Sequence, residues 1–119
     1  HVARAALEGI ALQVFDLLDA MQKDSGATLK ILRVDGGASA NDLLMQFQAD
    51  LLGITLHRPH NLETTAFGAA SLAALGVGLF KDLDEVSRAW QLQRDFAPSM
   101  PKSEVYERVR QWHAAVVKA

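Results

Sequence analysis

The chain has 119 residues, of which 50% are hydrophobic, a formal net charge of −2 at pH 7 and no cysteine. This length and composition fit one domain with a real core, and the small negative charge gives no electrostatic case for nucleic acid or acidic membranes as partners. The lack of cysteine excludes disulfides and thiolate metal sites and is compatible with the cytosol, so we expect a cytoplasmic protein.

The chain begins at His1, without a methionine and already in a helical pattern, which predicts a piece of a longer protein. Apolar residues then recur every three or four positions until Ser25-Gly26. This spacing predicts an amphipathic helix of about six turns, and the glycine predicts its end. The expected apolar stripe consists of Leu7, Ile10, Val14, Leu17, Leu18 and Met21.

The next segment combines a strand with a glycine turn. Leu29–Val34 is mostly apolar and predicts a buried strand that is covered on both faces. Asp35 and the pair Gly36-Gly37 follow and predict a sharp turn into a helix. Glycine permits a close main-chain approach and unusual backbone angles, and the first N–H groups of a helix have no internal partner. Such a junction offers bare backbone to a flat ligand.

The rest of the chain continues the alternation of helices and strands. Small residues in its alanine-rich helix would let that helix pack very close to a neighbour. The order of elements predicts an α/β fold with a parallel or mixed sheet, whose ligands bind at the carboxyl ends of the strands, where Asp35–Ala38 lies. The expected elements are a helix over Asn41–Leu52 ending at Gly53, a strand over Ile54–His57 stopped by Pro59, the alanine-rich helix over Glu63–Leu75 ended by Gly76 and Gly78, a short helix over Asp82–Ala89, an edge strand over Gln91–Phe96 and a last helix over Ser103–Val117.

Each residue of the glycine turn has two interpretations. Gly36, Gly37 and Ala38 form either a nucleotide cradle or a plain strand-to-helix turn. Asn41 either reads a base edge with its amide or caps the following helix. Asp35 either binds ribose, Mg²⁺ or water, or stabilises the turn and the helix start. The residues alone leave these alternatives open.

Other polar and aromatic side chains favour structural roles. His57 and His60 bracket a proline with no adjacent carboxylate or cysteine, so we expect no metal site there. Glu63-Thr64-Thr65 predicts side-chain capping of the alanine-rich helix. Trp90 and Trp112 are expected to be core anchors. No Ser/His/Asp or Cys/His set has a spacing that indicates nucleophilic catalysis.

Several segments of the chain resemble one enzyme family in order. They are Val34–Asn41 (VDGGASAN), Leu44–Gly53 (LMQFQADLLG), Arg58-Pro59, Glu63–Ala70 (ETTAFGAA) and Gly76–Gly78. Together they resemble the carboxyl-terminal domain of the FGGY carbohydrate kinases, and within that family the glycerol kinase group. His1–Glu8 resembles the tail of the family's second signature pattern. The resemblance covers nearly the whole chain and weakens after about Pro98.

The resemblance implies a fold and a set of binding residues. Residues 1–119 would be the C-terminal nucleotide-binding domain of an FGGY kinase, truncated at its N-terminal side. The fold would be a partial ribonuclease H-like (actin-like ATPase) domain, with helices packed on a small mixed sheet. Gly37 would lie against the nucleotide through its backbone, and Asn41 would hydrogen-bond the adenine. Gly36 and Ala38 would belong to the same tight turn.

The resemblance also implies an activity for the parent enzyme, which would use ATP and Mg²⁺ to phosphorylate glycerol to glycerol 3-phosphate. The family's catalytic base and metal ligands lie before His1, so we expect no catalytic residue, no metal ligand and no kinase activity in this chain alone. Sheet edges and helix faces left uncovered predict self-association or a homo-oligomer. The alternatives are another FGGY sugar kinase, of the xylulose or ribulose type, and a non-catalytic α/β interaction module.

Overall fold

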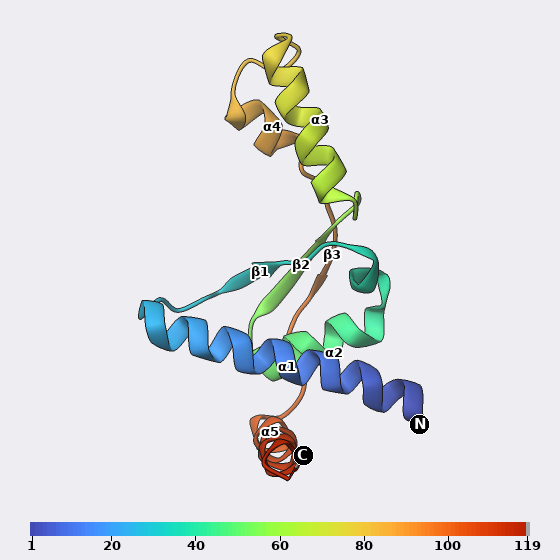
Figure 1. Cartoon of the computed structure of the whole chain (residues 1–119), viewed down its shortest axis with the longest axis vertical. Coiled ribbons are helices and arrows are strands. Elements are labelled where there is room, and N and C mark those ends of the chain that lie inside the picture. The colour runs from blue at the N-terminus through green and yellow to red at the C-terminus, as the bar shows by residue number, and fades with distance from the viewer. Residues whose placement is uncertain (119) are drawn as a thin grey trace.

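The computed structural model describes residues 1–118 and shows helices packed on a small mixed sheet (Figure 1). The three strands lie in the order β1-β2-β3, with β1 parallel and β3 antiparallel to β2. The predicted α/β class and mixed sheet are therefore confirmed. The elements are α1 (Val2–Ser25), β1 (Ile31–Arg33), a 3₁₀ turn η1 (Gly37–Ala40), α2 (Asp42–Leu52), β2 (Thr55–Pro59), α3 (Thr64–Gly76), α4 (Leu83–Ala89), β3 (Leu92–Phe96) and α5 (Lys102–Val116).

Local chemistry sets most element boundaries where the sequence predicts them. Gly26 ends α1 with φ 68°, and Gly53 ends α2 with φ 65°, both in the left-handed region that glycine adopts without strain. Asp82 caps α4 by accepting a hydrogen bond from the Glu85 amide at 2.9 Å. The predicted edge strand is β3, which ends at Phe96.

The core lies where α1 and α2 meet the lower part of the sheet (Figure 1). Ala11 of α1 is fully buried, and so is Leu56 of β2. A small side chain at Ala11 lets α1 approach α2 closely. The remaining buried members of this core are Leu12, Leu44, Met45, Phe47, Ala49, Leu51 and Phe96.

The prediction of a strand buried on both faces over Leu29–Val34 is wrong. Only Ile31–Arg33 is a strand, and Ile31 is 52% exposed. β1 lies at the edge of the sheet and pairs only with β2, from Ile31 opposite Thr55 to Arg33 opposite His57. An edge strand needs apolar side chains on one face alone, and apolar composition does not distinguish the two cases.

The predicted apolar stripe of α1 is only partly buried. Leu18 faces the core, whereas Ile10, Leu17 and Met21 are exposed. The helix therefore has a second apolar face, which no other described element covers. The expectation of uncovered helix faces is confirmed, and self-association through them stays a prediction.

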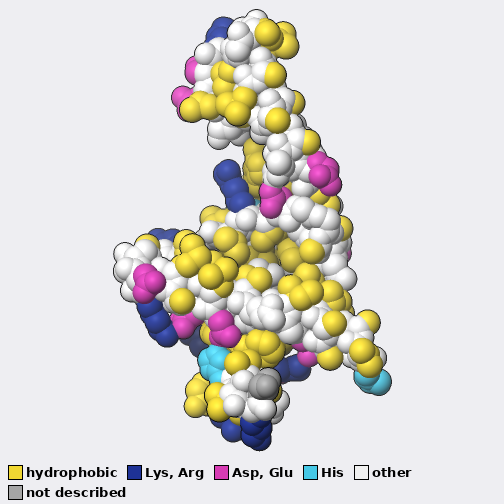
Figure 2. Space-filling model, in the orientation of Figure 1, with side chains coloured by type: hydrophobic (Ala, Val, Ile, Leu, Met, Phe, Trp, Pro, Cys, Tyr) yellow, Lys and Arg dark blue, Asp and Glu magenta, His cyan; other side chains and the backbone are white. Residues whose placement is uncertain are grey.

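Within the described residues no element packs closely against the alanine-rich helix α3, so the close contact that its small residues would allow stays a prediction. Together with α4, helix α3 forms an arm that projects from the sheet (Figure 1). Ser71 is its one buried residue, and a Cβ placed at Gly68 would meet no atom within 4 Å. Apolar side chains are consequently exposed along the arm (Figure 2), among them Leu72, Val77 and Leu79.

The last helix, α5, packs against the core and is tied to α1 by side-chain hydrogen bonds. Val105, Val109 and Trp112 pack against the core, which confirms Trp112 as an anchor, while Val116 is exposed. The Asp16 carboxylate of α1 accepts a hydrogen bond from Trp112 Nε1 at 2.7 Å, and its other oxygen lies 2.7 Å from His113 Nε2. One carboxylate thus holds two neighbouring side chains of α5.

This junction predicts a pH-dependent contribution to stability. Burial raises the pKa of Asp16, but the hydrogen bonds from His113 and Trp112 outweigh burial and hold that pKa below its ordinary value. A lowered pKa in the folded state stabilises the fold above the unfolded pKa, near 4, and the effect is lost as the pH falls through the folded pKa.

We therefore expect Asp16→Asn, which keeps an acceptor for Trp112, to lower Tm at pH 7 by about 2–5 °C, the size typical of a half-exposed pair. The difference from the unaltered chain should close in acid below about pH 4. Thermal melts across pH 2–7 measure it. A gap that stays constant over this range would contradict the role of the Asp16 charge.

Candidate functional site

The site predicted from the sequence is the segment between β1 and α2. Gly36 has φ 78° and ψ 168°, a backbone conformation that is essentially restricted to glycine. The Ser39 amide then donates to the Gly36 carbonyl at 3.0 Å, and the Asn41 amide donates to the Ala38 carbonyl at 3.1 Å. The predicted sharp turn is present, with the 3₁₀ turn η1 inserted before α2.

Three of the four predicted binding residues lie on the surface of this turn. Gly37, Ala38 and Asn41 are exposed, whereas Gly36 is half-buried. A Cβ at Gly37 would meet no atom within 4 Å. The outer side of the turn is therefore open backbone, as a surface that receives a flat ligand requires.

Asn41 performs the capping role that was one of its two interpretations. Its Oδ1 accepts a hydrogen bond from the Leu44 amide at 3.1 Å. No hydrogen bond from its Nδ2 is found within residues 1–118. The amide can therefore cap α2 with its oxygen while its nitrogen remains a donor for a ligand.

The start of the turn is tied to the start of α3. The Thr64 hydroxyl donates to the Asp35 carboxylate, and the Gly36 amide donates to the Leu62 carbonyl at 2.9 Å. Asp35 therefore stabilises the turn. Side-chain capping of α3 by Glu63 or the threonines is not observed, because Thr64 bonds Asp35 instead.

Arg58, for which the sequence predicted no role, contacts the turn from its inner side. Its side chain is only 8% exposed, and it donates to the Ser39 carbonyl at 2.7 Å, to Asp42 at 2.8 Å and to Gln93 at 2.8 Å. The period of two along β2 could have revealed it, since Arg58 shares a face with the buried Leu56.

Trp90 is not the core anchor that the sequence predicted. The Arg33 guanidinium lies 4.4 Å from the centroid of its ring, a cation–π distance. Trp90 also lines an open cavity of about 230 Å³ next to Asp35 and Thr64. It stands beside the turn because α4 ends there and returns the chain to β3.

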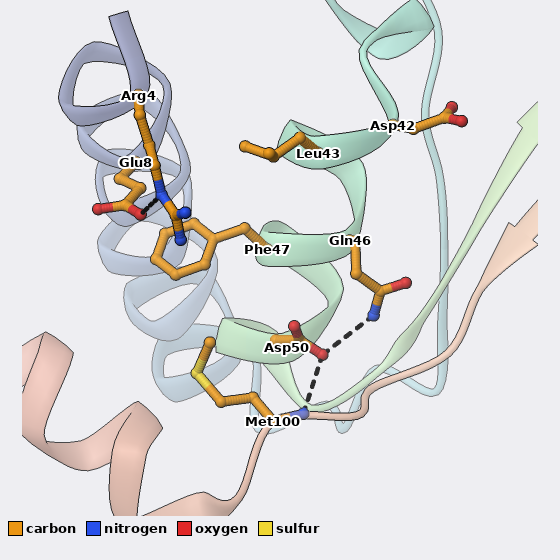
Figure 3. Close-up of a pocket in the computed structure, with 8 residues that line it drawn as sticks. All are labelled: Arg4, Glu8, Asp42, Leu43, Gln46, Phe47, Asp50 and Met100. Atoms are coloured by element: carbon orange, nitrogen blue, oxygen red, sulfur yellow. Dashed lines mark hydrogen bonds and ion pairs between the residues drawn. The ribbon is translucent and has the colours of Figure 1, made fainter. Parts of the chain in front are cut away.

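A larger open pocket of about 390 Å³ lies between α1 and α2 (Figure 3). Arg4 and Glu8 form an ion pair of 2.8 Å on its α1 side. Asp50 on its floor accepts hydrogen bonds from the Met100 amide at 3.2 Å and from Gln46 at 3.1 Å. Asp50 is therefore engaged in joining α2 to the segment before α5.

Neither a metal cluster nor a membrane span is found in residues 1–118. No three His, Cys, Asp or Glu side chains there are grouped so that they could hold a metal ion. None of the helices described combines the length and the apolar character that crossing a bilayer requires.

Sequence comparison places this turn within a known domain. Residues 1–77 match the model of the C-terminal domain of the FGGY family of carbohydrate kinases. The chain belongs to this family. The matched range contains β1, the turn, α2, β2 and α3, and so includes Arg58 and every predicted binding residue of this FGGY chain.

Curated relatives and solved structures agree with the family. Over 116 residues the chain is 62% identical to a glycerol kinase of Burkholderia ambifaria, and over 119 residues it is 57% identical to one of Rhodopirellula baltica. These matches cover 98% and 100% of the chain but only 23% and 22% of the relatives. The chain thus spans about a quarter of their length.

Among structures, the glycerol kinase of Plasmodium falciparum with ADP superposes with a TM-score of 0.84 at 33% identity, over 99% of this chain and 24% of that one. A xylulose kinase of Rhodospirillum rubrum gives a TM-score of 0.72 at 28% identity, over 98% of this chain and 24% of the other. The expected fold class, part of an actin-like ATPase domain in an FGGY kinase, is confirmed.

Proposed function

We propose that this chain supplies the adenosine-binding wall of a kinase that transfers the γ-phosphate of ATP to glycerol. Identities of 57–62% to glycerol kinases over essentially the whole chain support the acceptor. The likeness to a glycerol kinase solved with ADP supports the nucleotide. Since the chain spans about a quarter of such relatives, the complete activity belongs to the longer enzyme.

The binding residues in this proposal are Gly36, Gly37, Ala38 and Asn41. Gly36 makes the bend, Gly37 and Ala38 present open backbone to the nucleoside, and the free Nδ2 of Asn41 donates to a ring nitrogen of adenine. The single observation that carries the proposal is the exposed turn at the carboxyl end of β1, where its outer backbone is unobstructed.

The chemistry requires more than this wall. Phosphoryl transfer depends on holding the phosphates, Mg²⁺ and the acceptor hydroxyl together. In our proposal the rest of the kinase provides the catalytic base and the Mg²⁺ ligands, and residues 1–119 alone give no glycerol-dependent turnover. A cytoplasmic location is part of the same proposal.

A second candidate is another FGGY sugar kinase, favoured by the likeness to a xylulose kinase at 28% identity. The much higher identity to glycerol kinases favours glycerol as acceptor. Assays of the full-length enzyme with glycerol, xylulose and ribulose would separate the two, since each candidate predicts one preferred acceptor.

Substitutions at Asn41 test the nucleotide site. Asn41→Asp and Asn41→Ser keep a capping oxygen but lose the Nδ2 donor, so we expect stability within about 0.5 kcal/mol of the unaltered chain and a weakening of ATP binding by about tenfold, the value of one lost hydrogen bond. Amide chemical shifts during ATP titration measure the binding, which will be weak because one wall carries it.

Asn41→Ala is the matched variant for the cap, because it removes oxygen and nitrogen together and should also cost about 1 kcal/mol of stability. Saturable shifts centred on Gly37 in the unaltered chain are the expected result. Shifts that are absent at millimolar ATP, or that persist undiminished in Asn41→Ser, would contradict the proposed contact and favour a non-catalytic interaction module.

A further inference from the structure

We propose that Arg58 is a positioning residue that holds the turn Gly36–Asn41 in the shape that receives the nucleotide. This inference rests on the proposed function and adds a residue outside the turn itself. Arg58 lies on β2, the central strand, and its guanidinium reaches the buried side of the turn.

The contact with Ser39 acts at the middle of the turn. Ser39 is buried, and both its amide and its hydroxyl donate to the Gly36 carbonyl, at 3.0 and 2.7 Å. Its own carbonyl faces inward and accepts from Arg58 Nη1 at 2.7 Å. Arg58 therefore holds the inner side of the segment whose outer side carries Gly37 and Ala38.

The contact with Asp42 acts at the end of the turn. Arg58 Nη1 also lies 2.8 Å from the Asp42 carboxylate, in the residue directly after Asn41. One guanidinium thus fixes the residues on both sides of the segment Ala40-Asn41. A charge-assisted hydrogen bond of this kind is about twice as strong as a neutral one.

Arg58 is itself held in place on its other sides. Its Nε donates to Gln93 at 2.8 Å, and its guanidinium carbon lies 5.1 Å from the ring centroid of Phe96. A buried arginine with its charge paired and its donors directed gives a preorganised support. A turn that is already ordered loses less entropy when the ligand binds, so affinity depends on Arg58 without a direct contact.

The test measures ATP binding in the unaltered chain, in Arg58→Met and in Arg58→Lys. We expect Arg58→Met to raise the Kd about tenfold. Arg58→Lys restores the charge opposite Asp42 but cannot also reach Ser39 and Gln93 from one compact ammonium group, so it should restore only part of the affinity. Hydrogen exchange of the Ser39 and Asn41 amides, which donate to carbonyls within the turn, should accelerate in both variants relative to amides of α5.

Two controls distinguish positioning from general destabilisation. Arg110→Met makes the same change at an exposed residue of α5 and should leave the Kd unchanged. Leu51→Ala removes a core side chain that is 3% exposed and lowers stability, but the Kd of its folded fraction should stay the same. If Arg58→Met does not fold, the Kd of Arg58→Lys and its hydrogen exchange test the positioning role instead.

Three results would contradict a proposal, each in a distinguishable way. If the unaltered chain fails to bind ATP, both the proposed function and the positioning role that rests on it are contradicted. If it binds ATP and Arg58→Lys binds equally well with unchanged exchange at Ser39 and Asn41, only the positioning role fails. If Leu51→Ala weakens binding as much as the Arg58 variants, Arg58 contributes stability alone.

Discussion

Replacing Gly36 with alanine is expected to destabilise the fold by about 1–3 kcal/mol, the cost of forcing a side chain into a glycine-only backbone region. Its φ of 78° and ψ of 168° carry the prediction. A Cβ there would meet no atom within 4 Å, so the cost comes from the backbone and not from a clash. Urea denaturation of Gly36→Ala measures it.

The same substitution at Gly37 is the matched control. It should leave stability nearly unchanged and weaken ATP binding. Gly37 does not have a positive φ, and its Cβ position is open, so Gly37→Ala should change stability by less than about 0.5 kcal/mol. In our proposal its methyl group would stand between the turn and the nucleoside. ATP binding should therefore weaken at least about tenfold, by loss of the close approach.

Equal loss of stability in both glycine variants would contradict the backbone argument at Gly36. Undiminished ATP binding in Gly37→Ala would contradict the nucleotide contact while leaving the description of the fold intact. Measuring urea midpoints and Kd values on the same two preparations therefore separates the structural glycine from the binding glycine.

The largest loss of stability is expected from Phe96→Ala, at about 3–5 kcal/mol. Phe96 is 2% exposed, and it is the single buried residue of β3. Its ring also lies 5.1 Å from the Arg58 guanidinium and 4.8 Å from that of Arg94. Removing the ring opens a cavity in the core and takes away the apolar surface on which both cations rest. Chemical denaturation measures the loss.

Phe96→Leu and Leu92→Ala are the matched comparisons. Phe96→Leu keeps most of the apolar volume and should cost less than half as much as Phe96→Ala. Leu92 is on the same strand but 44% exposed, so Leu92→Ala should cost less than about 1 kcal/mol. Similar losses for Phe96→Ala and Leu92→Ala would show that β3 contributes through its strand pairing and not through the ring.

The element boundaries were predictable because local chemistry determines them. Gly26 and Gly53 end helices through their own left-handed backbone, and Asp82 begins one through its own side chain. These signals act within a few residues and do not depend on what packs nearby. The turn at Gly36 belongs to the same class, so the sharp bend after β1 lies where the sequence predicts it.

Burial was less predictable because it depends on which elements meet. The apolar pattern of α1 indicates a helix with apolar faces, but it does not say that Leu18 is covered while Leu17 is exposed. The alanines of α3 would allow close packing, but they do not indicate which element packs against the helix. Arg58 was missed for the same reason, since its three partners are 16 to 35 residues away in sequence.

The arm formed by α3 and α4 is the segment between β2 and β3. The first and last residues of this segment are hydrogen-bonded to each other. The His60 amide donates to the Gln91 carbonyl at 3.0 Å, directly beyond the paired strands. Because the sheet holds the two ends of this segment together, the number of residues between them can change at a small cost in loop-closure entropy. Evolution could therefore lengthen, shorten or exchange the part of this segment beyond Thr64 while the strand register, the Arg58 support and the contacts of Leu62 and Thr64 with the glycine bend stayed the same.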